Sequence, residues 1–148
     1  MHDVPEDSGH NREIQVIGLV LGAVAAPAIA HLAIWSGIGA PDWRVVLPAL
    51  VFGGLVGRYT LPVLLPSGDG VPGVLFGGMF AGSVGLLAGA FAAFPLGGVA
   101  GFLCGGVAGA WVMLLWPRLG SLGMPWRVCA AMFSGMLVSL VLSVVWVS

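Results

Sequence analysis

The side chain with the clearest potential for chemistry is Arg58, an arginine inside a long apolar stretch. An ionisable group within a membrane span is a functional-site hypothesis by default. Its guanidinium could bind an anion or pair with an acid on another chain. The alternative is that Arg58 and Tyr59 mark the membrane surface, with the arginine reaching up to the lipid headgroups.

His31 is the second candidate, because a neutral imidazole inside a span can ligate haem iron or the magnesium of a chlorophyll. The stretch Ala30-His31-Leu32-Ala33-Ile34-Trp35 resembles the pigment-ligating stretch of bacterial light-harvesting antenna polypeptides, which implies a pigment ligand at His31. Pro27 stands where that family usually has a small residue. The alternative is a histidine near the outer surface, bonded to a carbonyl or to water.

Residues for catalysis are missing from the apolar stretches. None of them contains Asp or Glu, so a nucleophile, a base and an orienting acid cannot be assembled there. The same absence counts against a carrier coupled to protons or sodium. Ser134, Ser139 and Ser143 could line a polar path, although such serines more often bond their own backbone. Cys104 and Cys129 form no Cys-x-x-Cys pair, so we expect neither a disulfide framework nor a metal site. Because the spans lack catalytic acids, we do not expect an enzyme.

The composition is that of a membrane protein. The chain has 148 residues, of which 59% are hydrophobic and 7% are charged, and its mean hydropathy is +1.07. A soluble domain carries about 25% charged residues. There is no lysine, and the five arginines do not cluster, which argues against nucleic acid as a partner.

Small residues recur at every fourth position through the centre of the chain. The ladder is Gly73, Gly77, Ala81, Gly85, Gly89, Ala93, Gly97, Gly101, Gly105 and Gly109. In lipid, small residues four apart let helix backbones approach closely, so all but Gly73 and Ala93 are our expected packing sites. A second set lies beside the first, at Gly78 with Gly82 and Gly106 with Ala110. These two sets predict that the helices of this region form the centre of a bundle.

Five membrane spans are expected, at residues 14–36, 43–65, 71–93, 97–116 and 128–147, after a polar tail at 1–13. The uncharged stretch between Asp69 and Arg118 is too long for one crossing of a hydrocarbon core of about 30 Å, and Phe94–Gly98 is the natural corner. The fold class is therefore an all-α integral membrane protein, with residues 14–148 forming one compact five-helix domain. The outer spans also carry small residues four apart, but in only three or four matches each, which a Gly- and Ala-rich composition can produce by chance. Those residues are Gly18, Gly22, Ala26 and Ala30, then Ala49, Gly53 and Gly57, then Ala131, Gly135, Ser139 and Ser143.

The arginines suggest an orientation. With five spans, Arg12, Arg58, Arg118 and Arg127 fall on the side of the N-terminus, and Arg44 alone falls on the other. The positive-inside rule then puts the N-terminus in the cytoplasm and the C-terminus outside, in what we expect to be a bacterial cytoplasmic membrane.

Our main hypothesis is a non-catalytic, multi-pass subunit that packs through its glycine-rich helix faces into a larger membrane complex. Its partners would be the lipid bilayer and other subunits or copies of itself, and it needs no cofactor. One alternative is a small homo-oligomeric channel or transporter for ions or small solutes. A further alternative is an accessory protein that binds a pigment or haem through His31.

Overall fold

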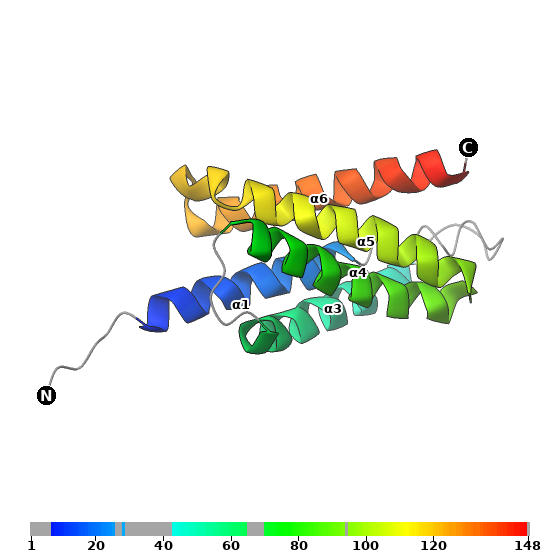
Figure 1. Ribbon diagram of the computed structural model, residues 1–148, viewed down its shortest axis with the longest axis horizontal. Coiled ribbons are helices and arrows are strands. Elements are labelled where there is room, and N and C mark those ends of the chain that lie inside the picture. Colours follow the sequence, from blue (N-terminus) through cyan, green and yellow to red (C-terminus); the bar gives the residue numbers. More distant parts are fainter. Residues whose placement is uncertain (1–6, 26–27, 29–42, 65–69, 94, 148) are drawn as a thin grey trace, which may run out of the picture.

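The structure is a computed structural model, which describes residues 7–25, 28, 43–64, 70–93 and 95–147. These residues form an all-helical fold without strands (Figure 1). The elements are α1 (Asp7–Val24), α3 (Trp43–Leu64), α4 (Val71–Ala93), α5 (Leu96–Leu115), the short 3-10 helix η1 (Arg118–Ser121) and α6 (Met124–Val147).

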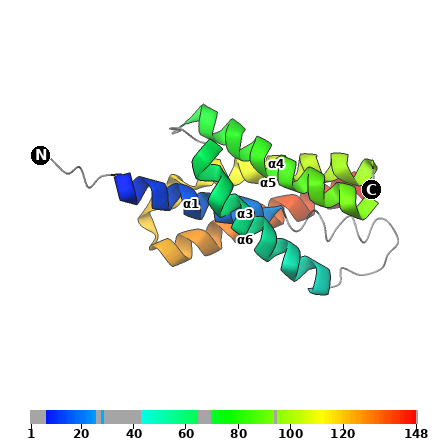
Figure 2. The same ribbon diagram turned by 90° about the horizontal axis from the view of Figure 1, so that it is seen from below.

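The helices run along the long axis of an elongated bundle and alternate in direction. The start of α1 and the end of α6 lie at opposite ends of the bundle (Figure 1). The α4 and α5 helices lie alongside each other in both views, whereas α3 crosses α1 obliquely (Figure 2). The bundle therefore contains two closely packed pairs, α1–α3 and α4–α5, with α6 packed against α1 and α5.

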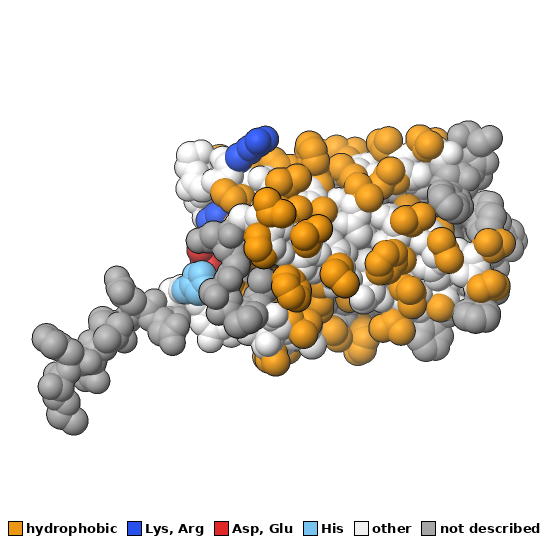
Figure 3. Space-filling model, in the orientation of Figure 1, with side chains coloured by type: hydrophobic (Ala, Val, Ile, Leu, Met, Phe, Trp, Pro, Cys, Tyr) orange, Lys and Arg blue, Asp and Glu red, His pale blue; other side chains and the backbone are white. Residues whose placement is uncertain are grey.

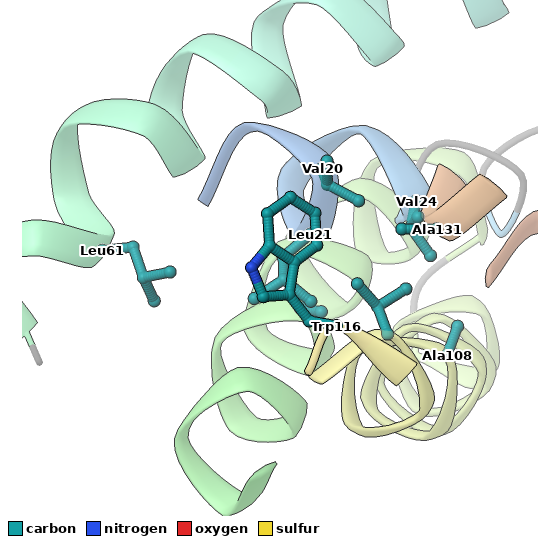
Figure 4. Packing of buried hydrophobic residues seen from close by; sticks show 9 residues of the cluster. Val20, Leu21, Val24, Leu61, Ala108, Trp116 and Ala131 are labelled. Atoms are coloured by element: carbon teal, nitrogen blue, oxygen red, sulfur yellow. The ribbon is translucent and has the colours of Figure 1, made fainter. Parts of the chain in front are cut away.

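The helix at the centre of the bundle is α1, which contacts each of the other four α-helices. Its residues Val20, Leu21 and Val24 are fully buried and meet Leu61 of α3 and Val112 of α5 in one hydrophobic cluster (Figure 4). The expectation that the helices of residues 71–116 form the centre is thus corrected, because α1 shares that place. The α4 and α5 helices pack mainly against each other, α5 also packs directly against α6, and α1 connects this pair to α3.

Most helix boundaries lie close to the expected spans. The α3 and α4 helices match to within a residue, while α6 begins at Met124 because Pro125 is tolerated in a first helical turn. The α4 helix ends at Ala93 and α5 begins at Leu96, so the chain turns at the expected corner, where Pro95 accepts the first backbone bond of α5 from Gly98 (3.1 Å).

The first span differs from the expectation. The α1 helix begins at Asp7, so residues 7–13, expected in a polar tail, are helical. An acidic residue at a helix N-terminus is favoured by the helix dipole, and Glu13 is held by a contact to α6. Of the expected span at 14–36, the structure describes residues 14–25 and 28.

Among the described residues, four helices are long and apolar enough to cross a membrane, namely α3, α4, α5 and α6. Their outward faces carry large exposed apolar side chains, such as Phe52 and Leu87. On the face shown in Figure 3, charged and histidine side chains gather at the end where α1 begins, and apolar side chains are spread over the remaining described surface. The chain is therefore an all-α helical bundle of membrane type.

Candidate functional site

The ladder residues of α4 and α5 face each other across the seam between the two helices. A Cβ added at Gly85 would overlap the carbonyl oxygen of Gly101, and a Cβ added at Gly101 would overlap that of Gly85. A Cβ at Gly105 would lie 2.5 Å from the carbonyl oxygen of Ala81, closer than real Cβ atoms come. Only residues with little or no side chain fit here. All eight expected packing sites are buried: Gly77, Ala81, Gly85, Gly89, Gly97, Gly101, Gly105 and Gly109.

The α1–α3 seam is built in the same way. Gly22 lies against the carbonyl group of Gly53, and Gly18 against that of Gly57, so a Cβ at any of the four would collide with backbone of the opposite helix. Carbonyl oxygens that approach the Cα of the facing helix make weak Cα–H···O contacts as well as close van der Waals packing. Two pairs of glycines therefore set the distance between α1 and α3.

The α6 helix also turns its small residues inward. Its buried residues are Ala131, Gly135, Ser139 and Ser143, which are the small residues that the sequence spaces four apart. A Cβ at Gly135 would lie 2.8 Å from Val24 of α1 and 2.9 Å from Val112 of α5, so this helix packs into the groove between the other two.

Arg127 joins three helices at the end of the bundle where α1 begins. Its Nε and Nη2 donate hydrogen bonds to the backbone carbonyl of Trp116, at 3.1 and 2.8 Å, and its Nη1 donates to Oε1 of Glu13 at 3.2 Å. The guanidinium carbon lies 4.3 Å from the centroid of the Trp116 ring, close enough for a cation–π interaction. We call Arg127, Trp116 and Glu13 the end cluster.

The end cluster holds the end of α5 and the start of α6 together and connects both to α1. Arg127 is largely buried, with 14% of its side chain exposed, and its cation neutralises the carbonyl end of α5, where the helix dipole is negative. Trp116 is buried, and its indole nitrogen lies on the side of Leu61 in Figure 4 without a hydrogen-bond partner. In the sequence, Trp116 and Arg127 belong to the triplets Trp116-Pro117-Arg118 and Pro125-Trp126-Arg127, and tryptophan beside arginine is typical of a membrane surface. Nothing in the sequence could connect Arg127 to an acid 114 residues away.

Arg58 and Tyr59 do not enter the bundle. Both are exposed on the outer face of α3, and the guanidinium carbon of Arg58 lies 5.9 Å from the Tyr59 ring centroid. Arg58 is therefore available to a lipid or to another chain, and it lines no internal site.

His31 lies outside the described residues, as do the neighbours that carry its resemblance to antenna polypeptides. Pigment or haem ligation by this residue stays a prediction.

Hydroxyl groups on the helices mostly bond their own backbone. Thr60 donates to the carbonyl of Val56, Ser83 to that of Met79 (2.8 Å), Ser134 to that of Ala131 (3.0 Å) and Ser143 to that of Leu140 (2.8 Å). Ser139 is buried without a hydrogen-bond partner. In the described part of the chain no three His, Cys, Asp or Glu side chains come close enough to hold a metal ion.

Among the grooves that the described residues form, two apolar ones involve the outer surface of α4. One, of about 310 Å³, lies over the α4–α5 seam and has Gly78 and Gly106 in its lining, between larger residues such as Met79 and Phe102. The other, of about 380 Å³, lies between α3 and α4, and large side chains such as Phe76 line it instead of glycines. Only the first groove would let another helix backbone come close.

Comparison with known proteins adds no further guide to function: no protein-family model, no curated protein and no solved structure matches this chain.

Proposed function

We propose that this chain is a non-catalytic, multi-pass membrane subunit that packs through small-residue helix faces into a larger membrane assembly. The partner can be another membrane chain or a further copy of this one. The observation that carries the proposal is the α4–α5 groove, which exposes part of Gly78 and Gly106 on the outer surface.

This groove is what remains after the two helices have packed together. Gly85 and Gly101 contact each other inside the seam and are buried, so no further helix can pack on them. Gly78, Gly106 and Ala110 are only half-buried. Because lipid tails are as apolar as leucine, helices associate in a bilayer by close packing, and half-open glycines between larger side chains offer a helix a surface to pack on.

In the proposed topology the chain crosses the membrane five times, with α1 and the residues that follow it forming the first span. The N-terminus and the end cluster lie on the cytoplasmic side, and the C-terminus lies outside. Support comes from Figure 3, where charged side chains gather at the end where α1 begins.

The test is to extract the protein from its native membrane in mild detergent and to measure its mass under native conditions. We expect a mass well above that of the 15.1 kDa protomer. Replacing Gly106→Leu should reduce that mass, because a leucine would fill the groove. The fold should tolerate the change, because a Cβ at Gly106 would lie 3.4 Å from the carbonyl oxygen of Gly78, and Gly106 borders the open groove that would take the rest of the leucine side chain.

Gly120→Leu is the matched control, because a Cβ at Gly120 meets nothing within 4 Å. It adds the same side chain outside the groove and should leave the assembly intact. A wild-type chain that runs alone at the mass of one protomer would rule the proposal out.

The channel alternative would need its pore between protomers, because Leu21, Leu61 and Val112 fill the middle of the described bundle. Flux measured in liposomes tests this alternative, and an absorption spectrum of the purified protein tests the pigment or haem alternative.

A further inference from the structure

Two arginines lie near each other along the α1–α3 pair. Gly18 lies opposite Gly57 in this antiparallel pair, and Arg58 directly follows Gly57 on α3. Arg12 comes six residues before Gly18, roughly 9 Å further along the α1 axis. An arginine side chain is long enough for both guanidiniums to reach one group between them.

Both arginines also lie on the same side of the pair. A Cβ added at Gly53 of α3 would meet α1 and also lie 3.8 Å from Val84 of α4. The atoms nearest to a Cβ at Gly54 belong to α1, so Gly54 marks the side of α3 that turns away from α4. Arg58 comes four residues after Gly54. Residues four apart share a helix face, so Arg58 lies on that same side.

The α1 helix gives the same result. Leu19 marks its side away from α4, because it meets Gly54, whereas Leu21 meets α4. Gln15 and Arg12 come four and seven residues before Leu19 and share its face. Arg12, Gln15 and Arg58 therefore form one outer surface, near the end of the bundle where α1 begins; we call it the arginine face.

The arginine face carries uncompensated charge. The ion pair of the described residues joins Glu13 to Arg127, and neither Arg12 nor Arg58 has an acidic partner in that part of the chain. Both are exposed. Placing a charged guanidinium beside an apolar outer surface costs free energy unless an anion at the membrane surface neutralises the charge.

We propose that the arginine face binds the phosphate of an anionic phospholipid headgroup. Guanidinium groups recognise phosphate oxygens through paired N–H donors, and two of them can share one phosphate. Phe52 and Leu55, exposed further along α3, would lie beside the acyl chains. These are large side chains, which suit flexible hydrocarbon better than a closely packed helix. The proposal does not depend on the subunit function.

The test uses the full-length chain in nanodiscs that contain equal amounts of phosphatidylglycerol and phosphatidylcholine. Native mass spectrometry then measures the ratio of the two lipids that stay bound. Wild-type protein should retain phosphatidylglycerol preferentially. Arg12→Gln and Arg58→Gln should each lower that preference about five-fold, and the double variant should lose it. Soluble glycerol phosphate should not displace the bound lipid.

Arg118→Gln is the matched control, since Arg118 is exposed in η1, outside the arginine face. It should keep the preference for phosphatidylglycerol. The proposal is overturned if wild-type protein shows no preference, if Arg118→Gln lowers it as much, or if glycerol phosphate competes. A double variant that keeps the lipid preference but loses a co-purifying protein would assign the face to a protein partner and also overturn it.

Discussion

The α1–α3 and α4–α5 pairs bring two helix backbones into contact by the same means, yet they differ in how that contact is distributed. In α4–α5 the helices run alongside each other from a short corner. Small residues meet at three levels of this seam, which are Gly85 with Gly101, Ala81 with Gly105 and Gly77 with Gly109. In α1–α3 the helices cross obliquely, and two glycine pairs make the closest approach. The close approach of two helices therefore depends on which glycines face each other, and a long repeat is not required.

The largest effect should come from Gly22→Ala, at the α1–α3 crossing. The added Cβ would overlap the carbonyl group of Gly53, and backbone cannot move aside without separating the helices. We expect a loss of about 3 kcal/mol in unfolding free energy, at the upper end for overpacking. Reversible unfolding by sodium dodecyl sulfate in mixed micelles, followed by circular dichroism, measures it.

The control for this change is Gly9→Ala on the same helix, where a Cβ meets nothing within 4 Å. It should be neutral or slightly stabilising, because alanine is the better helix former. Equal stability of the Gly22 and Gly9 variants would show that α1 and α3 do not touch at Gly22.

A smaller effect is expected from Gly101→Ala in the α4–α5 pair, about 2 kcal/mol by the same overpacking argument. The Cβ would overlap the Gly85 carbonyl, but the many contacts along this seam can share the displacement. Gly98→Ala is the control, because its Cβ would meet Ala90 at an ordinary 3.6 Å. If Gly101→Ala proved more harmful than Gly22→Ala, our ranking of the two seams would be reversed.

The end cluster is one of the contacts between the α1–α3 pair and the α4–α5 pair, and a change at Arg127 tests its contribution. Arg127→Gln removes two hydrogen bonds to the Trp116 carbonyl and the stacking on its ring. We expect a loss of about 1–2 kcal/mol, since hydrogen bonds from charged groups are stronger than neutral ones. The same unfolding assay applies. An unchanged midpoint would mean that the end cluster adds nothing measurable to the stability of the bundle.

The smallest effect should follow Glu13→Gln. The ion pair with Arg127 is 3.2 Å long, but the Glu13 side chain is 48% exposed, so solvent screens it. A loss below about 1 kcal/mol is expected, and added salt should shrink the difference from wild type. A loss as large as that of Arg127→Gln would show that the acid, and not the Trp116 carbonyl, is the main partner of the arginine.

The fold was predictable where the sequence pattern is local. The corner near Pro95 and the bounds of α3 and α4 follow from helix-breaking residues and from the length of the apolar runs. The small residues of α6 are indeed its buried face, although four matches were too few to separate them from composition.

The rest depends on contacts between residues far apart in the chain. Gly18 and Gly22 become informative only once they face Gly57 and Gly53, and a spacing of four on one helix does not name its partner. For the same reason the central place of α1 and the bond from Arg127 to Glu13 could not be predicted. The exposed position of Arg58 agrees with both of the original interpretations of that residue, and so decides between neither.

Disulfide cross-linking at the α1–α3 crossing is the most direct test of the packing described above. An added Cβ at Gly54 would lie 3.9 Å from that of Ala23, within the range that a disulfide spans. Cysteines at these two positions, with Cys104 and Cys129 replaced by serine, should form an intramolecular disulfide under mild oxidation in native membranes. Failure to form it, while a matched pair at Ala90 and Gly98 in the α4–α5 seam does, would contradict the contact between α1 and α3.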